Sequence, residues 1–432
     1  MARTYTPEDA YSLMNALVKQ ATGQQSVTAT DTSSFVSAGE LVMATGTENV
    51  LNALSILIGR TFMAVRPYGA KLQLINAINT GMYTNRMRKI SFYAKDAQPA
   101  GFVNTDLYTN LADGYTNGQN TPASPNSTKS MWEQNQAVPL ECHMGGQSVW
   151  SDSITIYEEA LKVAFRGPDE FISFVNGIMT ERENDIESQK EAFNRMTMLN
   201  AIAGRMDMTD NGDIPNGAIN LTAGFNARFG TSYTSAQLRT TYLSDFLAYM
   251  VSTIKQYSNL MEHRTAAFHW SPAKTVNGVS YTLLRHTPKD RQKLVLYRPL
   301  IIESEAEVLP EIFHDGLLRI ENYEGVDYWQ GLTGTLTNNP AINVTPAIPE
   351  ADSTDAAFGT QVAGSAVAQD YIVGFLFDED ALMVDYQFEG SYTTPLEARK
   401  LYRNLWFHYS KNAINDFTEN GIVFYMADPV TP

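Results

Sequence analysis

A long stretch of helical periodicity constrains this chain more than any other feature. Apolar residues recur at roughly helical spacing from Pro168 to about Met206, with polar and charged residues between them. The pattern begins at Gly167-Pro168-Asp169-Glu170, which places proline in the first turn and two carboxylates at the positive end of the helix dipole. At 1.5 Å per residue such a helix would run roughly 55 to 60 Å, longer than most small domains are wide. We therefore predict a spine helix over residues 168–206.

An extended arm, residues 85–148, precedes the predicted spine. Residues 96–137 are rich in Gly, Asn, Thr, Ser, Pro and Asp, and loops of that length are uncommon inside compact domains. Apolar residues typical of strands flank this segment, at Met87, Ile90 and Phe92 and at Val138, Leu140, Cys142 and Met144. We predict a two-stranded ribbon with a floppy tip. Because an isolated ribbon is only marginally stable in water, we expect it to lie on another surface, such as that of a second subunit.

Two groups of like charges suggest contacts between subunits. On the predicted spine, Glu183, Glu187 and Glu191 stand four residues apart, where like charges repel. The first strand of the arm carries the opposite excess, in Arg86, Arg88, Lys89 and Lys95. Pairing between neighbouring subunits would resolve both excesses. The alternative is that both are ordinary solvated surfaces, with Glu191 partly offset by Arg195.

The composition is that of an ordered globular protein. Of 432 residues, 44% are hydrophobic and 18% are charged, which allows two or three domains with a sizeable core. The net charge of −16 disfavours nonspecific binding to DNA or to anionic membranes. The single cysteine, Cys142, excludes an intrachain disulfide, and we predict that it is a buried, small apolar residue. The sequence shows no signal-peptide pattern and no run of eighteen apolar residues, so we expect no membrane span.

The remaining elements are predicted from local patterns. A short amphipathic helix begins near Pro7, a turn-rich arm covers residues 23–37, and a buried helix covers about residues 48–63. The segment 207–230 is predicted to be a loop or mobile insertion. Thr234 and Gln237 form a capping-box signature before a helix over Leu238–Leu260, where a compact α+β domain begins. Strands are predicted at 265–270, 293–297, 320–323, 371–377, 381–388 and 421–426. Residues 330–369 are predicted to form a long surface excursion. Residues 395–410 fit a helix or a strand equally well.

Common catalytic signatures are absent from the sequence. It has no glycine-rich phosphate loop, no Gly-x-Ser-x-Gly elbow, no His-Glu-x-x-His and no Cys-x-x-Cys. Cys142 and His143 are neighbours on a predicted strand and point to opposite faces, so they cannot easily share a proton. The weak metal candidates are Glu262, His263 and His269; Asp207, Asp210 and Asp213; and Asp378, Glu379 and Asp380, all of which fit ordinary turns or helix ends better. We predict no catalytic residue, no cofactor and no metal.

The order of these elements resembles the major capsid protein of tailed double-stranded DNA bacteriophages, which has the Hong Kong 97-type fold. The resemblance rests on the extended loop, the spine, an axial domain over about residues 233–393 and the return strand 421–426. The segments 375–382 (FLFDEDAL) and 394–402 (TPLEARKLY) also resemble the closing stretch of such proteins.

The resemblance implies an α+β chain divided into five parts. These are an N-terminal arm and buried helix (1–84), an extended β-ribbon loop (85–148), a peripheral domain containing the spine (149–232), an axial domain (233–393) and a return to the peripheral domain (394–432). It also implies a structural, non-enzymatic role in the virion. Hexamers and pentamers would form an icosahedral head around double-stranded DNA, with each extended loop lying across a neighbour's peripheral domain. Assembly would occur in the bacterial cytoplasm.

The implied partners are other copies of the chain, a separate scaffold protein, a portal and decoration proteins. DNA would be enclosed without sequence-specific binding, which suits the acidic charge of the chain. Two other classes fit the same sequence. An encapsulin-like nanocompartment would share the architecture and enclose protein, and a soluble acidic enzyme would form a small, monodisperse oligomer.

Overall fold

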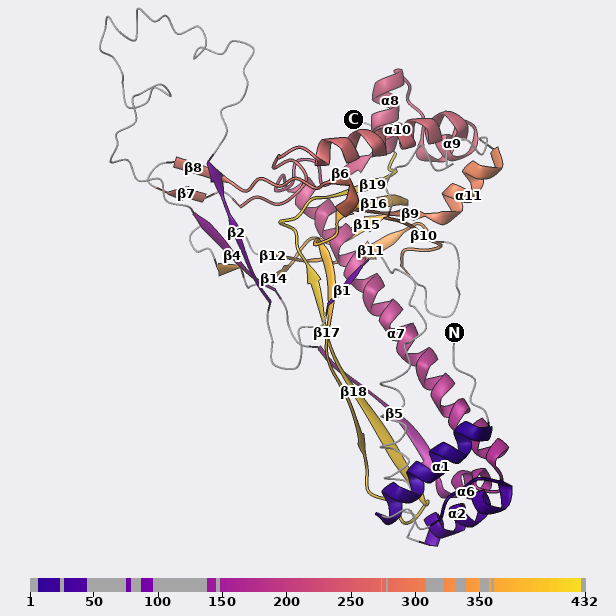
Figure 1. The fold of residues 1–432 in the computed structure, drawn as a ribbon. Helices are drawn as coiled ribbons and strands as arrows, with labels where there is room; N and C mark the ends of the chain where they lie inside the picture. Colours follow the sequence, from indigo (N-terminus) through magenta and orange to yellow (C-terminus); the bar gives the residue numbers. More distant parts are fainter. Residues whose placement is uncertain are drawn as a thin grey trace, which may run out of the picture.

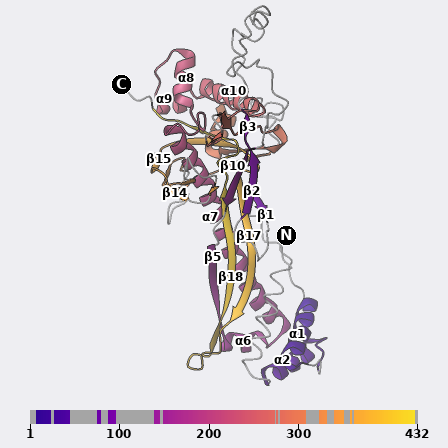
Figure 2. The same cartoon turned by 90° about the vertical axis from the view of Figure 1, so that its left-hand side faces the viewer.

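The computed structural model describes residues 7–23, 27–44, 75–78, 87–95, 138–144, 148–272, 274–276, 279–307, 322–330, 339–349, 357–358 and 361–428. This part of the chain forms an elongated molecule (Figure 1). A broad body built on a five-stranded sheet lies at one end, and a small group of helices, the foot, lies at the other. One long helix, α7, connects them (Figures 1 and 2).

The spine prediction is confirmed by α7 (Pro168–Asp210), which extends past Met206. It has 43 residues, which corresponds to about 65 Å at 1.5 Å per residue. Extended backbone at Gly167 and proline at the first helical position begin the helix, with Asp169 and Glu170 in its first turn. After the C-cap Asn211, the backbone of Gly212 has a φ of 85° and turns the chain away.

A four-stranded sheet runs beside α7 (Figure 1). Its order is β1 (Asn76–Ile78), β17 (Leu382–Thr393), β18 (Tyr402–Asn415) and β5 (Ser148–Tyr157). The last three strands are antiparallel, and β1 is parallel to β17. The segment 395–410, left open by the sequence, becomes a strand from Tyr402 because its side chains alternate between the core, as at Leu405 and Phe407, and the other face.

The body contains the five-stranded sheet. Its order is β10 (Asn322–Val326), β9 (Gln292–Tyr297), β16 (Ile372–Asp378), β19 (Gly421–Tyr425) and β6 (Ala218–Asn220). A short 3-10 helix, η1 (Lys289–Arg291), leads into β9. Around the sheet lie α8 (Leu221–Phe229), α9 (Ser235–Thr240), α10 (Leu243–Met261) and α11 (Arg298–Glu307) (Figure 1). Every residue of β16 is buried, so both faces of the sheet are covered there.

The foot is a separate apolar cluster. It joins α1 (Pro7–Thr22), α2 (Thr32–Ala44) and α6 (Glu158–Ala164) to the first turns of α7. The ring of Phe171 lies 5.8 Å from that of Phe35 and 5.6 Å from that of Phe165. The predicted turn-rich arm over residues 23–37 is therefore wrong from Thr32 onward. The Asp31 carboxylate accepts a 2.7 Å hydrogen bond from the Ser34 amide, so the Ser/Thr-rich sequence caps a helix there.

The ribbon prediction is confirmed where the structure describes the arm. The strands β2 (Met87–Phe92) and β4 (Pro139–Met144) pair in antiparallel register. A parallel partner of β4 is β13 (Ala357–Phe358), and β3 (Ala94–Lys95) pairs with β8 (Val279–Thr282), which itself pairs with β7 (Lys274–Val276). We call β2, β4 and the connecting residues up to Lys95 the ribbon root. The predicted tip, residues 96–137, and the predicted helix 48–63 lie outside the described residues.

The predicted surface excursion, residues 330–369, is ordered against the spine in its described parts. There β11 (Ile342–Val344) pairs with β15 (Val367–Gln369), and β12 (Ala347–Pro349) pairs with β14 (Gln361–Ala363). The side chain of Asn200 on α7 donates to the carbonyl of Ala347 at 3.1 Å and accepts from its amide at 2.7 Å. The side-chain amide of Asn200 therefore fixes this low-charge segment to α7.

Three local predictions need correction. The expected loop 207–230 contains the end of α7, β6 and α8, because Asn220 caps α8 by accepting from the amides of Thr222 and Ala223. The expected helix 238–260 is two helices, interrupted at Thr241–Tyr242. The expected strand 265–270 is irregular apart from a bridge at Thr265, since its apolar residues are buried without ladder pairing.

The other strand predictions agree in place, with small offsets. The segment 320–323 yields β10 from Asn322, and 293–297, 371–377, 381–388 and 421–426 correspond to β9, β16, β17 and β19. The chain leaves the five-stranded sheet after β16 and enters the four-stranded sheet at β17. The five-part division remains a prediction. None of the helices in the described ranges is long and apolar enough to cross a membrane.

Candidate functional site

The ribbon root has two chemically different faces. On its inner face, Tyr93, Leu140 and Cys142 are buried with Leu283 in a small apolar cluster. The outer face exposes apolar side chains, with Ile90 51% and Phe92 60% exposed. In the ladder Phe92 lies directly across from Pro139, and Ile90 lies across from Glu141, so this face carries three apolar residues and one carboxylate.

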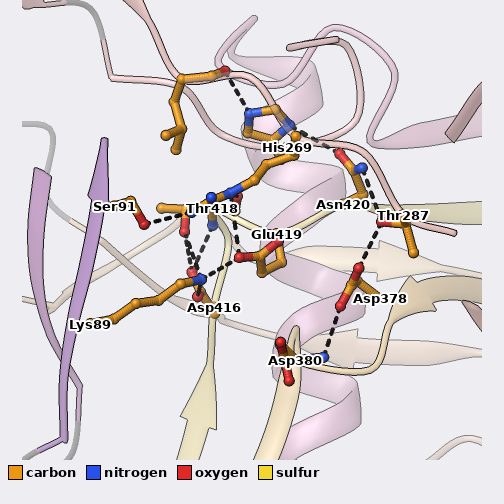
Figure 3. Close-up of polar contacts among 12 residues, drawn as sticks. Lys89, Ser91, His269, Thr287, Asp378, Asp380, Asp416, Thr418, Glu419 and Asn420 are labelled. Atoms are coloured by element: carbon orange, nitrogen blue, oxygen red, sulfur yellow. Dashed lines mark hydrogen bonds and ion pairs between the residues drawn. The ribbon is translucent and has the colours of Figure 1, made fainter. Parts of the chain in front are cut away.

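Charged residues connect the inner face to the body (Figure 3). The ammonium of Lys89 pairs with the carboxylates of Asp416 and Glu419. Arg285 lies 3.3 Å from the same Glu419 carboxylate and donates a 2.7 Å hydrogen bond to the hydroxyl of Ser91 on β2. We call Lys89, Arg285, Asp416 and Glu419 the ion cluster.

The loop between β18 and β19 positions both carboxylates of the ion cluster. Asp416 accepts from the Thr418 amide at 2.9 Å and from its hydroxyl at 2.6 Å, a local arrangement that fixes the carboxylate before Lys89 reaches it. The amide of Asp416 donates to the carbonyl of Ala381 at 2.9 Å, which ties the loop to the start of β17. The site is therefore held by the body and completed by one residue of the ribbon.

Burial and charge act in opposition on these groups. Burial lowers the pKa of Lys89, but Asp416 and Glu419 outweigh it and leave that pKa above its ordinary value. For Asp416, burial raises the pKa, but the bonds from Lys89 and Thr418 bring it below its ordinary value. Burial dominates for Glu419, whose pKa is raised despite Lys89 and Arg285. Glu419 is therefore the carboxylate of the pair that protonates first on acidification.

Arg205, on α7, lies fully buried behind the ion cluster. Its guanidinium donates to the carbonyl oxygens of Glu419 at 2.9 Å, Gly421 at 3.3 Å and Phe268 at 3.4 Å. Burial lowers its pKa to about 10, against the attraction of Asp416, Glu419 and Asp378. A Cβ at position 421 would lie 2.6 Å from the guanidinium carbon, so glycine is required for this close approach.

A second polar chain leads from the same loop to the β16–β17 turn (Figure 3). The buried ring of His269 has Nε2 2.9 Å from the carbonyl of Leu283 and Nδ1 3.0 Å from Oδ1 of Asn420. The Asn420 amide donates to Thr287, whose hydroxyl donates to Asp378 at 2.7 Å. Burial lowers the pKa of His269 to about 4, so the ring is neutral at pH 7. These bonds fix the loop that carries the carboxylates.

The site has the chemistry of a structural joint. Cys142 is buried and free, as predicted, and burial raises the pKa of its thiol to about 12, so it is not a nucleophile at neutral pH. Within the described ranges, no group of three or more His, Cys, Asp or Glu side chains is placed to hold a metal ion. The predicted candidates Glu262 and His263 are exposed at a helix end, whereas His269 is buried among other partners.

A second surface of interest lies on the four-stranded sheet, on the side away from the foot cluster. Its outward positions carry Tyr157, Tyr392, Tyr402, Trp406 and His408, which we call the aromatic face. Tyr392 is 60% and Tyr157 53% exposed. The ring of Tyr157 lies 5.8 Å from that of Tyr402, and the ring of Tyr392 lies 5.5 Å from that of His408. The outward neighbours on β5 and β18 are Ser151, Ser153, Thr155 and Asn404, which carry no charge.

The structure places the predicted contact residues as follows. Lys89 belongs to the ion cluster of its own subunit. Glu191 lies 2.9 Å from Arg195, and Glu187 lies 3.8 Å from Lys190, both along α7. For Arg88 and Lys95, on β2 and β3, and for Glu183, on α7, only the backbone is described, and Arg86 lies outside the described residues. Sequence reasoning missed Arg285, Asp416 and Glu419; the polar run 416–420 between two apolar strands was the available signal.

Comparison with known proteins identifies a family. A family model for the Phi29-like phage major capsid protein matches residues 148–425, which contain the spine and most of both large sheets. No curated protein matches the chain.

Among solved structures, the chain is similar to the capsid structure of Staphylococcus phage Andhra, with 11% identity, a TM-score of 0.47 and coverage of 84% of this chain and 88% of that chain. It is also similar to a structure of the head fiber and inner core protein gp22 of bacteriophage P68, with 12% identity, a TM-score of 0.46 and coverage of 84% and 89%.

The family match agrees with the resemblance seen in the sequence. The order of ribbon, spine, body and return strand is the predicted α+β arrangement of the Hong Kong 97-type fold. The chain belongs to the Phi29-like phage major capsid protein family.

Proposed function

We propose that this protein assembles as hexamers and pentamers into an icosahedral phage head that encloses double-stranded DNA. The family match over residues 148–425 is the observation that carries the proposal, because it supports a structural role in a phage capsid. The separate scaffold protein, the portal and the decoration proteins belong to the proposal, as do assembly in the host cytoplasm and the five-part domain division.

We infer that subunits meet through surfaces that carry little charge. The outer face of the ribbon root offers Ile90, Phe92 and Pro139 beside a single carboxylate, Glu141, and the aromatic face offers rings with hydroxyl and amide neighbours. Each chain carries a net charge of −16, so the repulsion between two copies is smallest where their contact surfaces carry few acidic groups. Interface cores are depleted of charge and enriched in aromatic residues. These features support a ribbon that lies on the peripheral domain of a neighbour.

The charged contacts proposed from the sequence are revised in one respect. Lys89 is used within its own subunit, so the candidates for pairing between subunits are Arg86, Arg88 and Lys95 with Glu183, Glu187 and Glu191. Such pairs would lie at the rim of the contact, where exposed charges contribute little affinity but help to set register.

The test is assembly of the expressed full-length chain, alone and with the scaffold protein, followed by light scattering and negative-stain imaging. We expect closed shells from the unchanged protein. The variant Phe92→Glu, which adds a charge to the outer face, should reduce shell yield strongly. Phe229→Glu is the matched control, because Phe229 is similarly exposed, at 53%, but lies on α8.

Three outcomes would count against the proposal. Equal shell yield from Phe92→Glu and Phe229→Glu would exclude the ribbon root from the contact. Shells that hold protein and no nucleic acid, when recovered from infected cells, would favour a nanocompartment. A small monodisperse oligomer under all conditions would exclude a capsid role.

A further inference from the structure

We propose that the ion cluster is a latch that fixes the ribbon root to its own subunit before the ribbon meets any other copy. The inference deepens the proposed function, because a ribbon held in one direction is preorganised for contact with a neighbour. The sequence led us to expect that the ribbon lies on another surface, such as that of a second subunit; the latch instead uses a surface of the same subunit.

The contacts of the ribbon root divide into two groups. Some join it to the β7–β8 hairpin: the β3–β8 ladder at Ala94 and Lys95, and the apolar cluster around Leu283. In Figure 1 this hairpin lies beside the ribbon, apart from the five-stranded sheet. Leu283, which follows β8, is itself joined to the body, because its amide donates to the Ser271 hydroxyl at 2.8 Å and its carbonyl lies 2.9 Å from the His269 ring. These contacts therefore hold the apolar edge of the ribbon root, and its charged edge is held separately.

The second group joins the ribbon root to the rest of the subunit. It consists of the Lys89 pairs with Asp416 and Glu419, the hydrogen bond from Arg285 to Ser91, and the two-residue ladder between β4 and β13. Lys89 is the charged side chain of the ion cluster that comes from the ribbon, whereas the two carboxylates come from the β18–β19 loop. The Asp416 side chain is only 2% exposed, so withdrawal of Lys89 would leave a buried carboxylate without its ammonium partner.

Protonation provides a way to open the latch experimentally. Lys89 lowers the pKa of both Asp416 and Glu419, so both carboxylates hold protons more tightly when Lys89 has moved away. In an open form whose β18–β19 loop still buries both carboxylates, more protons are bound than in the closed form, so acidification favours that opening. Burial already raises the pKa of Glu419 above its ordinary value in the closed form, so Glu419 is the first of the two carboxylates to take up a proton as the pH falls.

Four other titratable groups at the cluster keep their charge state between pH 7 and pH 5 in the closed form. Cys142, from β4, has a pKa raised by burial to about 12 and stays neutral, and the His269 ring has a pKa lowered by burial to about 4. Arg205 stays cationic, with a pKa lowered by burial to about 10. In the closed form Asp416 remains ionised, because Lys89 and Thr418 hold its pKa below its ordinary value. Among the described residues, Arg285 also faces the loop. Asp378 is connected to the loop through Thr287 and Asn420, and it lies 3.7 Å from Arg291.

Hydrogen exchange of the unassembled full-length chain tests the latch. We expect the amides of β2 and β4 to be protected at pH 7 and to lose protection at pH 5, after correction for the intrinsic pH dependence of exchange. The loss should approach tenfold, its limit for a pKa that differs by about one unit between the two forms, as the pH falls below that pKa in both. Amides of α10, in the body, should keep their protection and report that the chain remains folded.

Two variants separate the latch from general instability. Glu419→Gln cannot titrate, so protection of β2 should become the same at pH 7 and pH 5. In Lys89→Met, the amides of β2 should be unprotected at both pH values. If this variant does not fold, Lys89→Met can be combined with Glu419→Gln, which removes one charge of each sign. The amides of β2 should be unprotected in the double variant as well. Glu262→Gln, an exposed carboxylate 3.9 Å from Lys289, is the control and should respond to pH as the unchanged chain does.

The outcomes distinguish the latch from the capsid proposal. Protection of β2 that is equal at pH 7 and pH 5 in the unchanged chain, or that survives the loss of Lys89, would overturn the latch even if shells form. Loss of protection in the expected variants would support the latch even if shell assembly itself failed.

Discussion

At the scale of single residues, Arg205 joins three parts of the chain that are far apart in sequence. From α7 it donates to carbonyl oxygens at Phe268, Glu419 and Gly421. It lies 1% exposed, with the ring of Phe417 5.7 Å from its guanidinium carbon. Because the carbonyls carry only partial charge, the cation is held mainly by hydrogen bonds and by the more distant carboxylates.

Replacement of Arg205 should therefore destabilise the body. In Arg205→Met three carbonyls lose the guanidinium donor, although Phe268 keeps the Gly421 amide, and the carboxylates lose a balancing cation. We therefore expect a loss of about 3 to 5 kcal/mol in the free energy of unfolding. Chemical denaturation followed by tryptophan fluorescence would measure it. Arg228→Met, at an exposed position on α8, is the control and should change stability by less than about 0.5 kcal/mol. A loss in Arg205→Met no larger than that of the control would contradict the assigned role.

Residue-scale prediction succeeded where the environment was local. Cys142 was expected to be buried because it alternates with other apolar residues, and it is buried. Lys89 was expected to pair with carboxylates of a neighbouring subunit, but the partners it has within its own chain lie 327 and 330 residues farther along. A charge excess in a sequence indicates that partners exist, but it does not identify them. The ion cluster depends on tertiary proximity that neither periodicity nor spacing encodes.

At the scale of elements, two helix caps are expected to differ in strength. Asn220 caps α8 through the amides of Thr222 and Ala223, and its own amide donates to the carbonyl of Ala427 at 3.2 Å. Thr234 caps α9 in a capping box with Gln237, and the hydrogen bonds of this box are exposed. Asn220 therefore fixes both a helix start and the segment that follows β19.

The cap difference predicts an order of stability. Thr234→Ala should cost about 1 kcal/mol and Asn220→Ala about 2 kcal/mol or more, because the second change also removes a tertiary hydrogen bond. Thermal unfolding of the two variants against the unchanged chain would measure both. Equal losses would show that the contact with Ala427 contributes nothing beyond the cap.

Elements with strong boundary signals were predictable, and those that depend on their surroundings were not. The start of α7 and the capping box before α9 followed from proline, carboxylates and the Thr-x-x-Gln pattern. The segments holding α2 and α8 were read as arm and loop, because their Ser, Thr, Asn and Gly residues favour turns as readily as caps. The strand β18 could not be separated from a helix by periodicity alone. Pairing with β5 and β17 decides it.

At the scale of the whole molecule, element order predicted more than element geometry. The succession of ribbon, spine, alternating strands and helices, and return strand indicated a capsid fold, and the family match agrees. The crossing between sheets at the β16–β17 turn was not predicted. Which sheet a strand joins depends on long-range packing, which the sequences of β16 and β17 do not encode.

The net charge of −16 leads to a prediction about assembly and salt. If copies meet through surfaces that carry little charge, like-charge repulsion between whole chains is the main long-range force between them. Raising ionic strength from about 0.01 M to 0.15 M shortens the Debye length from about 30 Å to about 8 Å, which screens that repulsion. We therefore expect shells to form at a several-fold lower protein concentration at the higher salt. Light scattering at a series of protein concentrations, with imaging of the products, would measure the change.

The sign of the salt effect also discriminates between the two kinds of contact. If pairs between the cations Arg86, Arg88 and Lys95 and the carboxylates Glu183, Glu187 and Glu191 held the subunits together, screening would weaken assembly as salt rises. Phe92→Glu adds a charge to the outer face of the ribbon root, so assembly of this variant should depend on salt more steeply than assembly of the unchanged chain. Assembly that weakens with salt would therefore assign the contact to the charged pairs, and assembly that strengthens would assign it to the apolar ribbon and the aromatic face.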